Sequence, residues 1–331
     1  MQTTRTLGRD AIEVSALGFG CWAIGGEWQD ADGRPLGWGK VDDDESVRAI
    51  HRALDLGVTF FDTADTYGAG HSERVLGRAL GKRRDEVVIA TKWGNVFDEA
   101  TRTRTGTDDS PAHARRALTA SLARLGTDHI DLYQLHLGDV APERALELRE
   151  LCEEFVREGL IRGYGWSTDD PARARLFGEG AHCLAVQHAA NVFHDSAEMD
   201  AMFETAARAG LTSIIRSPLA MGLLGGKHRP GRVLESGDIR NSPPAWLPGF
   251  NEGAGADAGW VERVDALREA LTVGGRTPAQ GALGWLWTYH PFAVPIPGFR
   301  SVAQAEENAG AIEKGPLTVG ELADITLILR Q

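Results

Sequence analysis

The chain has few cysteines, and the three that it has are scattered. Cys21, Cys152 and Cys183 form no Cys-x-x-Cys pair and no even set for a disulfide framework, which favours the reducing cytoplasm. No stretch approaches the roughly 18 to 20 apolar residues that a membrane span needs, and residues 1–10 have no apolar signal core. We therefore expect a soluble, cytoplasmic protein.

Positive charge is also scarce. The sequence has 35 Lys and Arg residues against 47 Asp and Glu, a formal net charge of -12, and no basic stripe relieves this excess. Long-range attraction to nucleic acid or to anionic lipid is therefore not expected. An anionic ligand has to be held by local groups.

Two binding motifs are missing as well. No Gly-x-Gly-x-x-Gly follows a predicted strand, so the sequence does not support a Rossmann dinucleotide site. His71, His188 and His194 have no recognised metal-ligand spacing, so no metal is expected and a metal-dependent barrel isomerase or hydrolase is disfavoured. The sequence also shows no internal repeat.

What the sequence does contain is a regular alternation of strand and helix patterns. Strands are predicted at residues 16–20, 59–62, 87–92, 130–136, 162–167, 184–191, 212–217 and 293–296. Helices are predicted at residues 42–56, 72–80, 110–125, 142–158, near 172, 199–209 and 260–289. Eight such units in somewhat over 250 residues predict an α/β fold, a closed (β/α)8 TIM barrel spanning residues 1–331 as one domain.

Three segments lie outside this alternation. A hairpin at residues 4–14, turning at 8–10, is expected to plug one end of the barrel. Residues 225–259 are rich in Gly and Pro and are interpreted as a loop that folds over a ligand, with plain disorder as the alternative. Residues 94–109 carry Arg102 and Arg104, which meet either an acidic substrate or, as we favour, only solvent.

Four proton-handling side chains follow three successive predicted strands. Asp62 ends the strand at 59–62 and Tyr67 follows it, Lys92 ends the next strand, and His136 ends the one after. Each alone has an ordinary structural interpretation as a loop cap, a surface aromatic, a solvated charge or a core histidine. Because the carboxyl ends of barrel strands meet at one rim, the four together predict an active site.

Several motifs give the chain a family resemblance. Residues 61–68 (FDTADTYG), 90–92 (ATK), 132–136 (LYQLH), 217–227 (SPLAMGLLGGK) and 296–308 (IPG to EN) resemble the aldo-keto reductases over nearly the whole chain. The resemblance is closest to the bacterial and potassium-channel β-subunit-like branches, because of residues 22–25 (WAIG) and the Ser-Pro-Leu loop at 217–219. The resemblance implies an NADPH-dependent oxidoreductase that reduces an aldehyde, ketone or sugar carbonyl, or runs the reverse oxidation. A redox-sensing or regulatory subunit that binds NADPH with little turnover is the alternative.

The chemistry of the four residues agrees with this resemblance. Hydride transfer to a carbonyl leaves an alkoxide, which Tyr67 would protonate. The Lys92 ammonium would lower the tyrosine pKa from ~10 toward working pH, and Asp62 would hold that ammonium in place. His136 would orient the carbonyl oxygen through a neutral ring.

The resemblance also implies a set of residues that hold NADPH. They are Cys21, Trp22, Asp62, Ser167, Thr168, Gln187, Arg216, Ser217, Pro218, Leu219, Gly222, Lys227, Gly298, Arg300, Gln304, Glu307 and Asn308. Ser167 and Gln187 would bind the carboxamide, residues 217–227 the pyrophosphate, and a helix starting near Ser301 would present free amides to a phosphate. Arg300 would fork onto a 2'-phosphate, which favours NADPH over NADH.

Two positions depart from the family pattern. Arg216 stands where many members stack an aromatic residue on the nicotinamide, and Thr168 stands where many have Asn. Gly163 and Gly165 are expected to leave room inside the barrel. Among the tryptophans near strand ends, Trp22 and Trp93 are the candidate substrate-binding residues, with packing at the barrel mouth as the alternative.

Overall fold

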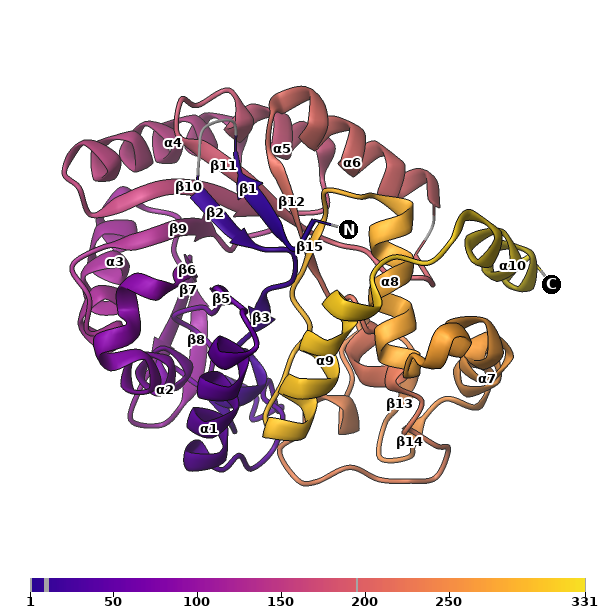
Figure 1. Ribbon diagram of the computed structural model, residues 1–331. Helices are drawn as coiled ribbons and strands as arrows, with labels where there is room; N and C mark the ends of the chain where they lie inside the picture. The colour runs from indigo at the N-terminus through magenta and orange to yellow at the C-terminus, as the bar shows by residue number, and fades with distance from the viewer. Residues whose placement is uncertain (1, 9–11, 195, 331) are drawn as a thin grey trace.

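The computed structural model describes residues 2–8, 12–194 and 196–330, and its centre is a ring of eight parallel strands (Figure 1). In chain order they are β3 (Phe19–Gly20), β5 (Phe60–Asp62), β6 (Val88–Trp93), β9 (Ile130–Leu135), β10 (Ile161–Ser167), β11 (Cys183–Ala189), β12 (Thr212–Arg216) and β15 (Val294–Pro295). The ring closes where the amide of Gly18 donates to the Pro295 carbonyl and that of Gly20 to the Pro297 carbonyl, both at 3.0 Å. The predicted (β/α)8 barrel is confirmed.

Helices surround the strands in Figure 1. They are α1 (Asp43–Asp55), α2 (His71–Leu80), α3 (Pro111–Leu125), α4 (Pro142–Arg157), α5 (Pro171–Gly178), α6 (Ser196–Ala209), α7 (Ala258–Thr272), α8 (Pro278–Tyr289), α9 (Val302–Lys314) and α10 (Val319–Leu329). Short 3-10 turns are η1 (Ala23–Gly25), η2 (Gly81–Glu86), η3 (Ala220–Gly225), η4 (Ile239–Asn241) and η5 (Val273–Gly275). Among these described residues, no helix is long and apolar enough to cross a membrane.

Two helical predictions need correction. The single segment expected at 260–289 is two helices, because Gly274 takes a left-handed φ of 71° and Thr277 starts α8 with a capping box. Helix α10 was not expected, although Thr318 and Glu321 form a second capping box at its start.

The predicted hairpin closes one end of the barrel. Strands β1 (Thr4–Leu7) and β2 (Ile12–Ser15) pair antiparallel and lie across the barrel in Figure 1. Leu7 and Val14 are fully buried there, in one apolar cluster with strand residues such as Leu132. The plug therefore fills the amino-terminal end, and only the opposite rim remains for a ligand; the predicted turn residues 9 and 10 lie outside the described residues.

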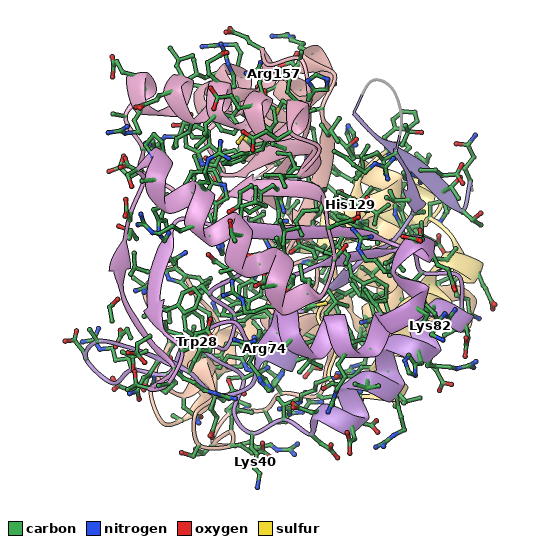
Figure 2. The ribbon with its side chains drawn as sticks, turned by 90° about the vertical axis from the view of Figure 1, so that its left-hand side faces the viewer. Trp28, Lys40, Arg74, Lys82, His129 and Arg157 are labelled. Atoms are coloured by element: carbon green, nitrogen blue, oxygen red, sulfur yellow. The ribbon has the colours of Figure 1, made fainter. Side chains whose placement is uncertain are left out.

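The opposite rim carries ordered structure that the sequence interpretation missed. Residues 94–109, expected as a solvated loop, form a hairpin of β7 (Asn95–Asp98) and β8 (Thr103–Thr107), and β4 (Gln29–Asp30) pairs with β8. Figure 2 places Trp28 at this side and Lys82 and His129 toward the plugged end.

The long segment at 225–259 is irregular but packed. Ile239, Leu247 and Phe250 are buried in one cluster, and β13 (Phe250–Asn251) pairs with β14 (Gly255–Ala256). Disorder, the alternative considered for this segment, is therefore wrong.

Candidate active site

Asp62, Tyr67, Lys92 and His136 meet at the open rim. The Nζ atom of Lys92 lies 2.5 Å from Oδ1 of Asp62 and 3.3 Å from the Tyr67 hydroxyl oxygen. The ring of His136 stands at 87° to that of Tyr67, with centroids 6.0 Å apart. The four side chains are therefore neighbours in a row, from Asp62 through Lys92 and Tyr67 to His136.

The Lys92 and Asp62 pair is withdrawn from water. Their side chains are 0% and 2% exposed, and Lys92 also donates to the Thr63 carbonyl at 2.8 Å. Burial lowers the pKa of Lys92, but the attraction of Asp62, together with Tyr67, outweighs it, so the net pKa is raised. The lysine is therefore held as a cation.

Asp62 is fixed through both of its oxygens. While Oδ1 faces Lys92, Oδ2 accepts hydrogen bonds from the amides of Gln134 at 3.0 Å and Gln187 at 2.8 Å. Parallel register aligns Lys92 with Gln134 on the neighbouring strand. Strands β5, β6, β9 and β11 thus meet at one carboxylate.

The expected effect of Lys92 on Tyr67 needs correction. Burial raises the pKa of the Tyr67 phenol, and the opposing effect of Lys92 does not cancel it, so the net pKa lies above its ordinary value. The phenol is therefore protonated at neutral pH. That is the state a proton donor needs.

His136 is held neutral. Its backbone amide donates to the Trp93 carbonyl at 2.8 Å, while its Nδ1 is buried with no partner among the described residues. Burial lowers its pKa well below the ordinary value, and the charges of Lys92, Arg216 and Arg104 add to this effect. A neutral ring can donate one hydrogen bond to a ligand oxygen.

Local backbone geometry presents Tyr67. Gly68, Ala69 and Gly70 follow it with φ between 53° and 88°, a left-handed turn that leads into α2. A Cβ on Gly68 would lie 2.1 Å from the Gly25 carbonyl oxygen, so only glycine fits this close approach. Below the turn, the Ser72 hydroxyl donates to the Cys21 carbonyl at 2.7 Å.

A cleft of about 670 Å³ opens above these residues. It is lined by Tyr67 and His136 and by most of the residues expected to bind the cofactor: Trp22, Asp62, Ser167, Gln187, Arg216, Ser217, Pro218, Leu219, Gly222, Lys227, Gly298, Arg300, Gln304, Glu307 and Asn308. Cys21 is fully buried and Thr168 is 5% exposed, and neither lines the cleft. Lys92 lies behind Tyr67.

Three expectations about this region fail on packing grounds. Trp93 is fully buried and stacks on Tyr133, so its side chain packs in the wall and does not reach the substrate space. A Cβ on Gly163 would meet the Leu184 side chain at 2.3 Å, and one on Gly165 the Ala185 carbonyl at 2.5 Å. These glycines make room for β11 and not for a ligand.

The start of α9 offers fewer free amides than expected. Glu45 accepts from the Val302 amide at 2.9 Å, and the Ser301 hydroxyl oxygen accepts from the Gln304 amide. Arg300 nevertheless lines the cleft, held by a hydrogen bond from its guanidinium to the Trp38 carbonyl at 3.0 Å. Positive charge at the α9 end of the cleft therefore comes mainly from side chains and not from free backbone amides.

The segment after β12 has unusual backbone conformations. Ser217, Ala220 and Met221 all have φ between 48° and 55°, a region that costs energy for residues other than glycine. Arg216, just before them, forms an ion pair with Asp169. Such strain is typical of ligand-binding segments.

Comparison with known proteins agrees with this geometry. The model of the aldo/keto reductase family matches residues 16–330. The chain belongs to the aldo/keto reductase family. Among curated members of the family, an aldo-keto reductase of Bacillus subtilis (YhdN) is 32% identical over 89% of this chain and 84% of its own length. A probable aldo-keto reductase of Glycine max is 31% identical over 92% and 83%.

Solved structures of the family share the fold. The glycerol dehydrogenase of Gluconobacter oxydans superposes with a TM-score of 0.81 at 28% identity, covering 99% of this chain and 95% of its own. An aldo-keto reductase of Klebsiella pneumoniae in complex with NADPH superposes with a TM-score of 0.70 at 26% identity, covering 99% and 96%. The protein is accordingly an oxidoreductase of this family.

Sequence reasoning missed some residues of the site. Gln134 donates to Asp62 but was not among the predicted site residues; its position two residues before His136, on the same strand face, was the available signal. Asn95 and Trp246 also line the cleft, but they come from rim segments whose packing no local pattern indicates. Among the described residues, no three His, Cys, Asp or Glu side chains gather as metal ligands.

Proposed function

We propose that the protein reduces an aldehyde, ketone or sugar carbonyl with NADPH, or runs the reverse oxidation, with Tyr67 as the proton donor. The observation that carries the proposal is the hydrogen-bonded chain from Asp62 through Lys92 to the Tyr67 hydroxyl, which ends in the cleft. The family relationship and the NADPH complex of the Klebsiella pneumoniae relative support the choice of cofactor.

The residues present fit such a cofactor. Gln187 and Ser167 line the cleft, and the side-chain oxygen of each has no hydrogen-bond partner among the described residues, so both are available to bind a carboxamide. Lys227 and Arg300 bring positive charge to the cleft of a chain whose net charge is -12. When bound, NADPH supplies the hydride that the carbonyl carbon accepts.

The chain's own residues handle the proton. Tyr67 donates its hydroxyl proton to the carbonyl oxygen as negative charge develops there. The Lys92 cation, 3.3 Å away, stabilises the phenolate that this transfer leaves, and Asp62 keeps the cation in position. The neutral ring of His136 donates a hydrogen bond that orients the same oxygen.

Kinetics with a panel of aldehydes, ketones and sugars, followed at the nicotinamide absorbance, test the proposal. We expect turnover with NADPH, and a loss of about 100-fold or more in Tyr67→Phe with NADPH binding unchanged, because only the proton donor is removed. Tyr164→Phe is the matched control, since its hydroxyl donates to Glu153 and does not line the cleft.

Retained turnover in Tyr67→Phe would refute the assignment of the proton donor. Tight NADPH binding by the wild type without turnover of any carbonyl would instead favour a redox-sensing role.

A further inference from the structure

The two halves of the rim differ in composition. The residues proposed to hold the cofactor come mainly from β10 to β12 and from the segments around η3 and α9. The other half is formed by the loops after β3, β6 and β9, which contribute Trp28, Asn95, Arg104 and Gly138 to the cleft lining. This second half is what remains for a substrate.

Arg104 is the cation of this second half. It sits in β8, whose pairing with both β7 and β4 holds its backbone in a three-stranded sheet. Its guanidinium has no hydrogen bond or ion pair within residues 2–8, 12–194 and 196–330. By contrast, two other arginines of the cleft lining form ion pairs with carboxylates outside the lining: Arg216 with Asp169, and Arg240 with Asp238.

Asn95 adds a second polar group to the same hairpin. The residue is 7% exposed and lines the cleft, and its side-chain amide has no hydrogen-bond partner in the described part of the chain. The amide nitrogen and oxygen are not fully enclosed, so a ligand in the cleft can reach them. Arg104 and Asn95 therefore offer donors that the fold itself does not use.

No acidic side chain that lines the cleft pairs with Arg104 or Asn95 among the described residues. The carboxylates among the described lining residues are Asp62, which is bound to Lys92, and Glu307, which lies 3.5 Å from the Lys227 ammonium. The charge of Arg104 also contributes to the lowered pKa of His136, which is expected if it lies near the reacting end of the cleft.

We propose that the substrate is an aldehyde or ketone that also carries a carboxylate, with its carbonyl oxygen at Tyr67 and His136 and its carboxylate bound by Arg104 and Asn95. This inference rests on the reductase function proposed above. The carboxylate is unchanged in the reaction: the carbonyl carbon gains the hydride and its oxygen gains the proton of Tyr67. Arg104 acts as a specificity-determining residue because a guanidinium pairs with a carboxylate through two parallel hydrogen bonds.

Matched substrates test the inference. kcat/KM is measured for 4-oxobutanoate against butanal and for 4-formylbenzoate against benzaldehyde, with NADPH, in the wild type, Arg104→Gln and Arg102→Gln. Arg102→Gln is the control, because it removes the same charge from the same hairpin. The Arg102 guanidinium donates to the Glu27 carbonyl, and the residue does not line the cleft.

We expect the wild type to prefer at least one carboxylate-bearing aldehyde to its neutral partner. Arg104→Gln should lose about 10- to 100-fold in kcat/KM for that aldehyde, as the loss of a charge-assisted hydrogen bond predicts, and less than about 2-fold for the neutral one. Arg102→Gln should change neither, and Arg104→Lys should recover part of the loss.

Three results would overturn the inference while leaving the reductase function intact: no preference for the charged aldehyde, an equal loss on both substrates in Arg104→Gln, or an equal effect of Arg102→Gln. Absence of turnover with all four aldehydes and with the wider carbonyl panel would instead remove the proposed function on which the inference rests.

Discussion

Breaking the buried pair of Lys92 and Asp62 should destabilise the protein by an amount that depends on which partner is removed. Asp62→Asn removes the negative charge that compensates the fully buried Lys92 ammonium, which is left with neutral partners such as the Thr63 carbonyl and the Tyr67 hydroxyl. The cost expected for an uncompensated buried charge is about 3 to 5 kcal/mol.

Lys92→Met should cost less, near the lower end of this range at about 3 kcal/mol, because the amides of Gln134 and Gln187 still donate to the remaining carboxylate of Asp62. The double variant removes both charges. It should therefore be more stable than the sum of the two losses predicts, by about 1 to 3 kcal/mol.

Urea unfolding followed by tryptophan fluorescence measures these free energies in a double-mutant cycle. A matched cycle on Glu204 and Arg208, an exposed ion pair one helical turn apart, should give a coupling of only about 0.3 to 0.5 kcal/mol. Single losses below about 1 kcal/mol, or additive losses at Asp62 and Lys92, would show that the pair is not the desolvated interaction described above.

Three further outcomes follow from the structure. Gly68→Ala should lower both stability and kcat, since its Cβ would come within 2.1 Å of a backbone carbonyl oxygen. Gly126 has nearly the same φ but open space around it, so Gly126→Ala should cost only about 1 to 2 kcal/mol of stability and leave kcat unchanged. Equal effects of the two substitutions in unfolding and kinetic assays would contradict this. Burial raises the pKa of Tyr67 above its ordinary value of 10.0, so the donor stays protonated below that raised pKa and loses its proton as pH rises through it. The kcat/KM for reduction should therefore be flat across neutral pH and fall only in strong alkali. A loss of kcat/KM on acidification near pH 6.5 would show that His136 titrates normally after all. Arg300→Gln should weaken NADPH binding about 10-fold and NADH binding less than about 2-fold in a fluorescence titration. Equal weakening of both would mean that Arg300 does not bind the 2'-phosphate that distinguishes NADPH from NADH.

Much of the fold was predictable because its signals are local. Strand β6 carries an apolar run that leads to Lys92. The N-cap of α1 is Asp42, whose side chain accepts from two amides of the first turn, as the acidic start indicated. What the sequence interpretation missed depends on distant partners: β8 is a strand because β4 and β7 pair with it, and its segment TRTGT has no apolar alternation of its own. The break before α8 has a local signal in Gly274 and in the capping box of Thr277.

The candidate site divides in the same way. Residue types at strand ends were enough to bring Asp62, Tyr67, Lys92 and His136 together, because barrel topology fixes where strand ends converge. The pKa of Tyr67 was mispredicted, since the charge of Lys92 was readable from the sequence but the depth of burial, which opposes it, was not.

The hydrogen bonds of Asp62 also determine how Gln187 is oriented. A carboxylate only accepts hydrogen bonds, so the group of Gln187 that lies 2.8 Å from Oδ2 has to be its NH2, and its side-chain oxygen is left for a ligand. That oxygen is an acceptor, which suits the NH2 of a nicotinamide carboxamide and not its carbonyl. The same carboxylate holds Lys92 against Tyr67. If the proposed cofactor site is correct, Asp62 links the orientation of the nicotinamide to the position of the proton donor, and Asp62→Asn should disturb both because an asparagine side chain can accept on only one side.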